Sequence, residues 1–90
     1  MTDRADRIRT VLQQALTPNT LDVIDDSARH HGHAGAAPGG QTHYNVRIVS
    51  PHFAGLGRVG RHRLVNQALA AEFSTGLHAL SLDLKAPGEP

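Results

Sequence analysis

The first stretch of the chain, residues 3–16, carries apolar side chains with the period of an α-helix. They fall three and four residues apart and therefore share one helix face, at Ile8, Val11, Leu12, Ala15 and Leu16. Asp3 and Asp6 lie at the predicted start, where the positive end of the helix dipole favours acidic residues, and Pro18 follows the predicted end. This pattern predicts an amphipathic helix with one buried face.

Three other segments alternate between apolar and polar residues, as strands with one buried face do. Residues 21–25 alternate imperfectly, residues 43–50 clearly, and residues 77–84 throughout. A second helix is predicted over residues 58–73, because its apolar residues again form a stripe and Gly76 follows it. The members of that stripe are Leu64, Val65, Ala68, Leu69 and Phe73.

The order of these elements, αββαβ, predicts a single α+β domain over residues 1–90. The first two strands are expected to pair antiparallel. Because the second helix makes a crossover, the third strand should run parallel to the second, with right-handed connectivity. Two helices would then pack on one face of a three-stranded mixed sheet. Residues 86–90 are expected to form a loose tail.

Residues 27–41 form an unusually long connection between the first two strands. They hold four glycines, one proline and three histidines, and a connection of this length is usually functional or disordered. It leads to the end of the sheet where the second strand begins, and a strand parallel to the second begins at that same end. Five histidines are therefore expected to share one edge of the sheet: His30, His31, His33, His43 and His78.

The sequence contains seven histidines and no cysteine. A disulfide, a thiolate metal site and a cysteine nucleophile are therefore excluded, whereas neutral imidazole is a common metal ligand. The spacing of His30, His31 and His33 matches no closed zinc site, so a solvated glycine-rich loop and a simple metal buffer both stay open. His78 suits a structural role, in which one ring nitrogen bonds the backbone, or a ligand role, and the two are compatible. His43 is expected to be structural or a neighbour of the site.

The charged residues are nearly balanced, with nine Lys and Arg against eight Asp and Glu and a formal net charge of +1. This balance does not favour a domain that binds nucleic acid by charge alone. Arg58, Arg61 and Arg63 nevertheless cluster near the predicted start of the second helix, where an anion is favoured. Residues 57–60 also spell the GxxG pattern of KH modules, although three aromatic residues give no platform for stacking bases.

Signals for catalysis, secretion and membrane insertion are missing from the sequence. Neither Ser27 nor Ser50 has an identifiable His/Asp relay, and there is no phosphate loop or dinucleotide fingerprint. No apolar run approaches the roughly 18 residues that span a membrane, and the N-terminus does not resemble a signal peptide. The expectation is a cytoplasmic, non-enzymatic protein that does not contact membranes.

Six segments, in this order and with compatible gaps, make the chain resemble the BolA family. They are residues 21–27, 32–34, 42–50, 53–56, 61–65 and 77–80. The resemblance runs from Ile8 to Lys85 and implies a class II KH-like αββαβ fold, which agrees with the predicted topology. The short stretch after the third strand departs from the family, in which a C-terminal extension is usual.

The resemblance also implies a function, because BolA-like proteins partner monothiol glutaredoxins and share a [2Fe-2S] cluster with them in iron–sulfur trafficking or iron sensing. The partner's cysteine and its bound glutathione supply two ligands. On this chain the ligands would be His78, in the His-Ala-Leu motif, and His33, in the long loop. His30 and His31 are alternatives to His33, and His43 is a neighbour of the site. Imidazole in place of thiolate raises the reduction potential of such a cluster and makes its binding sensitive to acid.

A competing function, also attributed to bacterial BolA proteins, is transcriptional regulation by direct DNA binding. Residues 51–73 would then form the contact surface, with Arg58, Arg61 and Arg63 as the nucleic-acid-binding residues. The near-neutral charge argues against high affinity. The sequence leaves open the particular glutaredoxin, the choice between cluster transfer and sensing, any DNA targets and homodimerisation.

Overall fold

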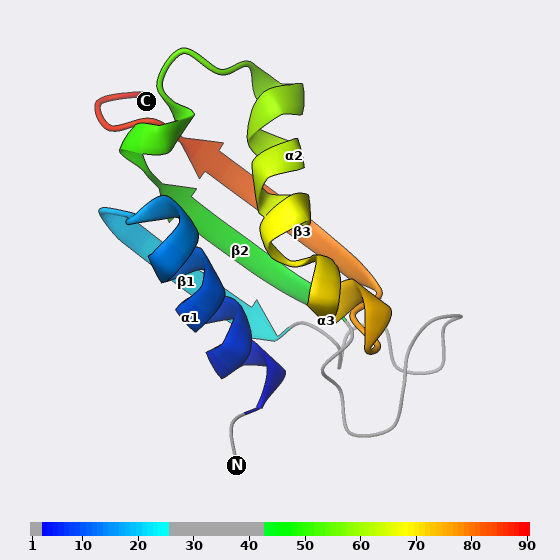
Figure 1. Cartoon of the computed structure of the whole chain (residues 1–90). Helices are drawn as coiled ribbons and strands as arrows, with labels where there is room; N and C mark the ends of the chain where they lie inside the picture. The colour runs from blue at the N-terminus through cyan, green and yellow to red at the C-terminus, as the bar shows by residue number, and fades with distance from the viewer. Residues whose placement is uncertain (1–2, 26–42) are drawn as a thin grey trace.

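The chain folds as a mixed α+β domain (Figure 1), in a computed structural model that describes residues 3–25 and 43–90. Within these residues the helices are α1 (Arg4–Leu16), α2 (Arg58–Ala68) and α3 (Ala70–Ser74), with a 3-10 turn η2 (Pro51–Phe53), and the strands are β1 (Thr20–Asp25), β2 (His43–Val49) and β3 (Ala79–Lys85). None of the helices in the two described segments is long and apolar enough to cross a membrane.

The three strands form one sheet in the order β1-β2-β3. β1 pairs antiparallel with β2, with Leu21 opposite Ile48, and β2 pairs parallel with β3, with His43 opposite Ala79. The helices cover one face of this sheet, as Figure 1 shows. The predicted α+β fold with a mixed sheet is therefore confirmed.

The hydrophobic core lies between the helices and the sheet. α1 contributes Ile8, Leu12 and Leu16, which are four residues apart and at most 3% exposed. Full burial of a side chain such as Ile8 contributes roughly 2 kcal/mol. The remaining buried apolar side chains among the described residues are Val23, Tyr44, Val46, Ile48, Phe53, Val65, Leu69, Leu77 and Ala86. Ala15, which the sequence places on the same helix stripe, is exposed.

The second predicted helix, residues 58–73, is interrupted at Leu69. The Leu69 amide donates to the Val65 carbonyl at 3.0 Å, but the Glu72 amide donates to the Leu69 carbonyl at 3.0 Å, three residues back instead of four. This tighter turn changes the helix register. As a result Phe73, predicted on the buried stripe, is 37% exposed, whereas Glu72, whose spacing from Val65 and Leu69 places it on the same stripe, is buried at 8% exposure.

Side-chain caps fix both ends of α1. The Asp3 carboxylate accepts a hydrogen bond from the Asp6 amide at 2.9 Å, which satisfies a free donor at the helix start. At the other end, the Ser50 hydroxyl donates to the Leu16 carbonyl at 2.6 Å and accepts from the His52 amide at 3.1 Å. Ser50 is fully buried and joins the end of α1 to the residue after β2.

The segment after β3, predicted as a loose tail over 86–90, closes into a turn. The Glu89 carboxylate accepts from the Ala86 amide at 2.6 Å and pairs with the Arg61 guanidinium at 2.7 Å. These hydrogen bonds hold the pKa of Glu89 below its usual value. Arg61 also donates to the Leu56 carbonyl at 2.8 Å, so this side chain joins the start of α2 to the end of the chain.

Candidate functional site

The edge of the sheet where β2 and β3 begin is the candidate site. Asp25, the last residue of β1, lies opposite Tyr44, and His43, the first residue of β2, lies opposite Ala79. Both ends of the 26–42 connection therefore meet the start of β3 at one edge, as the topology predicts. The three histidines predicted to join this edge from the connection, His30, His31 and His33, lie outside the described residues.

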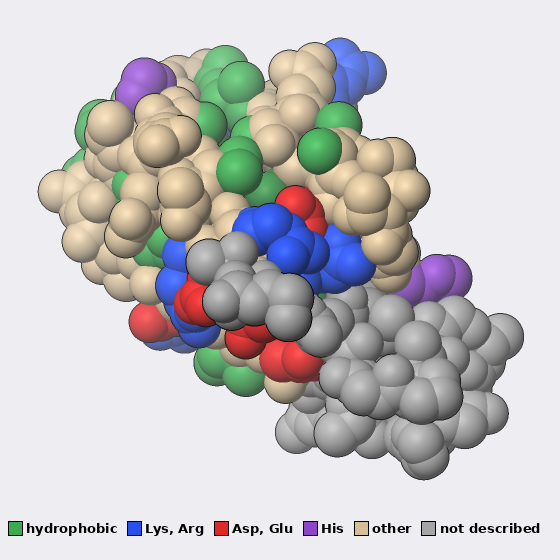
Figure 2. All heavy atoms as spheres, turned by 60° about the horizontal axis from the view of Figure 1, so that its bottom comes forward, with side chains coloured by type: hydrophobic (Ala, Val, Ile, Leu, Met, Phe, Trp, Pro, Cys, Tyr) green, Lys and Arg blue, Asp and Glu red, His purple; other side chains and the backbone are tan. Residues whose placement is uncertain are grey.

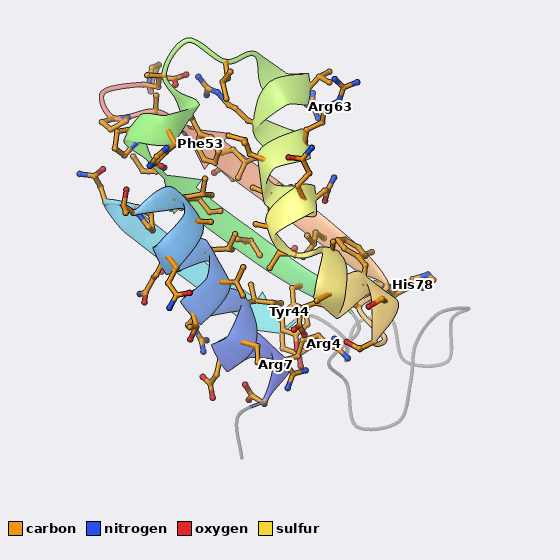
Figure 3. The ribbon with its side chains drawn as sticks, in the orientation of Figure 1. Arg4, Arg7, Tyr44, Phe53, Arg63 and His78 are labelled. Atoms are coloured by element: carbon orange, nitrogen blue, oxygen red, sulfur yellow. The ribbon has the colours of Figure 1, made fainter. Side chains whose placement is uncertain are left out.

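His43 and His78 lie side by side at this edge. Their ring centroids are 5.2 Å apart, and the ring planes are tilted by 49°. His43 is only 8% exposed, whereas His78 is exposed and lies where the chain passes from α3 to β3 (Figure 3). An exposed imidazole beside a buried one suits a ligand with a supporting neighbour. Among residues 3–25 and 43–90 there is no group of three or more His, Asp or Glu placed to hold a metal ion.

A buried ion-pair cluster, missed from the sequence, joins α1 to α3, the helix that precedes His78. The Arg4 guanidinium donates to the Glu72 carboxylate at 2.9 Å, and Arg7 donates to both oxygens of the same carboxylate at 3.2 Å. The side chains of Arg4 and Glu72 are 10% and 11% exposed. Figure 2 shows basic side chains gathered at this end of the molecule, with acidic ones directly beside them. The cluster joins the first turn of α1 to α3.

One signal in the sequence could have pointed to Arg4. It stands four residues before Ile8 and eight before Leu12, so it continues the row of α1 that faces the core. A charged residue on such a row must either reach solvent or find a buried partner of opposite charge. The partner, Glu72, carries the same kind of signal, because it stands three residues after Leu69 and seven after Val65 on the apolar stripe of the helix predicted over 58–73.

Tyr44 lies on the core side of the same edge and is 1% exposed. Its hydroxyl has no hydrogen-bond partner among the described residues. Burial raises the pKa of Tyr44 to about 12, and the negative charge of Asp25 adds to the rise. The site therefore contains a buried phenol that stays neutral well above the pH of the cell.

We expect the Tyr44 phenol to titrate near pH 12, about two units above a free tyrosine. The chain has one tyrosine and no tryptophan, so the ultraviolet band of the phenolate reports this group alone. Because the folded chain keeps the proton to a higher pH than the unfolded chain, the free energy of unfolding should fall as the pH rises from about 10 to about 12. Tyr44→Phe should lose less stability over that range. A folded chain whose phenol titrates near pH 10 would contradict the burial of Tyr44.

The three arginines predicted as a nucleic-acid surface differ in exposure and in their ion pairs. Arg58 and Arg63 are exposed on α2, and Figure 3 shows Arg63 pointing away from the sheet. Arg61 instead has a side chain only 14% exposed, paired with Glu89 and lying 5.9 Å from the Phe53 ring centroid. Its guanidinium is engaged in the fold, so the predicted surface keeps two exposed arginines.

These features define a class of protein: a small α+β domain with its helices on one face of a mixed sheet and an exposed histidine at one sheet edge. The sequence profile described as BolA-like protein matches residues 12–89. The chain belongs to the BolA-like protein family.

Relatives of known sequence and structure agree with this assignment. An uncharacterized protein of Sinorhizobium sp., encoded 5′ of cobS, is 48% identical over 84 residues, covering 92% of this chain and 90% of that protein. The chloroplastic protein BOLA1 of Arabidopsis thaliana is 48% identical over 89 residues, but this chain spans only 56% of its length. The solved BolA domain of SufE1 from Arabidopsis thaliana has a TM-score of 0.89 and 44% identity, covering 100% of this chain and 99% of that one.

Proposed function

We propose that this chain is a binding partner of a monothiol glutaredoxin, and that the two proteins together with glutathione hold a [2Fe-2S] cluster in iron–sulfur trafficking or iron regulation. In this proposal His78 is one ligand from this chain and His33, in the 26–42 connection, is the other. The role is one of binding, not catalysis. Every sulfur ligand comes from the partner or glutathione, because this chain has no cysteine.

The observation that carries the proposal is the exposed His78 packed against the buried His43 at the edge where the 26–42 connection begins and ends. Imidazole is a known iron ligand in [2Fe-2S] centres, where it raises the reduction potential relative to thiolate. His43 and His78 alone cannot complete a tetrahedral iron site. The remaining ligands would come from the connection and from a second molecule, which suits a shared cluster.

His43 is proposed to support His78 and not to bind iron itself. It is 8% exposed, and its ring lies 5.2 Å from that of His78, tilted by 49°. A ring packed in this way limits the rotation of its neighbour. Restricted motion of a ligand reduces the entropy lost when it binds, so His43 would favour a fixed orientation of the His78 imidazole.

Co-expression with a monothiol glutaredoxin tests the proposal. We expect a brown one-to-one complex whose visible spectrum is that of a [2Fe-2S] centre, whereas this chain purified alone from the same cells should be colourless. His33→Ala should weaken the spectrum, with His30→Ala and His31→Ala as matched variants of the same connection. If the two proteins purify separately and neither is coloured, the proposed function is wrong. If only His30→Ala or His31→Ala weakens the spectrum, the loop ligand is that residue and not His33.

A second candidate function is DNA binding through residues 51–73, which the exposure of Arg58 and Arg63 on α2 favours. Each arginine that contacts phosphate should steepen the salt dependence of binding by about one unit of log–log slope. Replacing Arg58 and Arg63 by alanine should then reduce the slope by about two units. Affinity that does not change with salt concentration would eliminate this function.

A further inference from the structure

The path of the chain from α3 to His78 is a helix ending of defined geometry. Gly76 adopts a φ of +126°, and the Leu77 amide donates to the Glu72 carbonyl at 2.9 Å. A residue of positive φ followed by a hydrogen bond back to the last helical turn is the pattern with which glycine ends helices. His78 is the next residue, so this turn determines where its side chain begins.

Arg4 binds this helix end from another helix, 68 residues away in the sequence. Its guanidinium donates to the Glu72 carbonyl at 3.0 Å and to the Thr75 carbonyl at 2.9 Å. Carbonyls at a helix C-terminus have no donor within the helix and carry the negative end of its dipole, so a cation there is favourable. Arg4 therefore caps the C-terminus of α3 from a different helix. The Glu72 carbonyl accepts hydrogen bonds both from Arg4 and from the Leu77 amide.

The carboxylate of Glu72 holds Arg4 in this position. It pairs with Arg4 at 2.9 Å and with Arg7 at 3.1 Å, and only 11% of the Glu72 side chain is exposed. The Arg4 guanidinium also lies close to the backbone of Gly76, because a Cβ added to Gly76 would lie 3.0 Å from Nη2 of Arg4. Any other residue at position 76 would therefore meet both backbone strain and the guanidinium.

We propose that Arg4, held by Glu72, is a positioning residue for His78: it caps α3, fixes the Gly76 turn and so keeps the His78 imidazole beside His43 in an orientation suited to ligation. The claim that this orientation suits ligation rests on the proposed function. The claim that Arg4 fixes the position of His78 relative to His43 applies to the chain alone.

Arg4→Met tests the proposal, with Arg9→Met as the matched control. Arg9 is also on α1, pairs with Asp6 at 2.9 Å and donates to a backbone carbonyl, that of Val23, at 3.1 Å. It joins α1 to β1 and does not touch the turn before His78. Both variants lose an arginine that binds a distant carbonyl, but only Arg4→Met uncaps α3.

In the chain alone we expect Arg4→Met to speed hydrogen exchange of the Leu77 amide about tenfold and to abolish the nuclear Overhauser effect between the His43 and His78 rings. Arg9→Met should leave both unchanged. In the complex with glutaredoxin, Arg4→Met should change the visible circular dichroism of the cluster and shorten its lifetime, and Arg9→Met should not. Arg4→Lys, which keeps the charge with a single donor group, should fall between the parent chain and Arg4→Met in each measurement.

The outcomes separate the two proposals. If Arg4→Met keeps the ring contact and the Leu77 protection of the parent, the positioning role is wrong, whether or not a cluster forms. If the parent complex binds no cluster while the ring contact is lost in Arg4→Met, the proposed function fails and the positioning of His78 stands. If Arg4→Met does not fold, Arg4→Lys is the test. Amide exchange, ring contact and cluster properties equal to those of the parent chain would overturn the inference, and intermediate values would support it.

Discussion

Replacing His78 by alanine is expected to abolish the [2Fe-2S] absorption of the complex with a monothiol glutaredoxin while leaving the fold of this chain intact. The His78 side chain is exposed, and exposed substitutions usually change stability by less than about 0.5 kcal/mol. The loss of colour would therefore reflect a missing ligand and not an unfolded protein. The visible spectrum of the co-purified complex measures the first effect, and thermal unfolding of the chain alone measures the second.

His52→Ala is the matched control for this variant. His52 is also exposed but lies in η2, which follows the opposite end of β2. It should keep the full spectrum. His78→Cys should restore a cluster whose spectrum is altered and whose reduction potential is lower, because thiolate replaces imidazole. A complex of His78→Ala with the parental spectrum would show that His78 is not a ligand.

Replacing Glu72 by alanine is expected to destabilise the chain by about 3 kcal/mol, because removal of one partner leaves a buried charge without compensation. Arg4 is 8% exposed, and the Glu72 carboxylate is its charged partner at 2.9 Å. Loss of this carboxylate also removes the acceptor of Arg7 at 3.2 Å. Urea unfolding of the chain alone, followed by circular dichroism, measures the change in the free energy of unfolding.

Asp83→Ala provides the comparison for an exposed ion pair. Asp83 lies 3.4 Å from Arg47, and their side chains are 47% and 65% exposed, so its removal should cost less than about 0.5 kcal/mol. Replacing Arg4 and Glu72 together by methionine should recover part of the loss, since no unpaired Arg4 charge remains. Equal effects of Glu72→Ala and Asp83→Ala would show that burial does not strengthen the Arg4–Glu72 pair.

The sheet topology could be predicted from the sequence because it depends on local patterns and on one general rule. Alternation predicts the strands, and the helical crossover predicts that β3 runs parallel to β2, as it does. The break at Leu69 could not be predicted, since neither glycine nor proline marks it. Helix propensity is a weak guide where tertiary packing decides, and here Phe73 is exposed after the break while Glu72 is buried beside Arg4.

The candidate site was predicted in part for the same reason. The topology placed His43 and His78 on one edge, and their rings are indeed neighbours. The alternative, nucleic-acid interpretation includes Arg61 because it lies near a helix start, but its guanidinium pairs with Glu89 at 2.7 Å. Such pairs between segments far apart in the sequence have no local pattern, so they appear only when the chain is folded.

The buried Ser50 hydroxyl that caps the end of α1 has a consequence for folding. Short isolated helices are marginal in water and depend on tertiary contacts. The last turn of α1 gains its side-chain cap only when the end of β2 is in place, and the last turn of α3 gains its side-chain cap only when α1 is docked. Each helix end is therefore completed by a different part of the chain. We expect folding in a single cooperative transition, with no stage at which either helix end is stable before the sheet has formed.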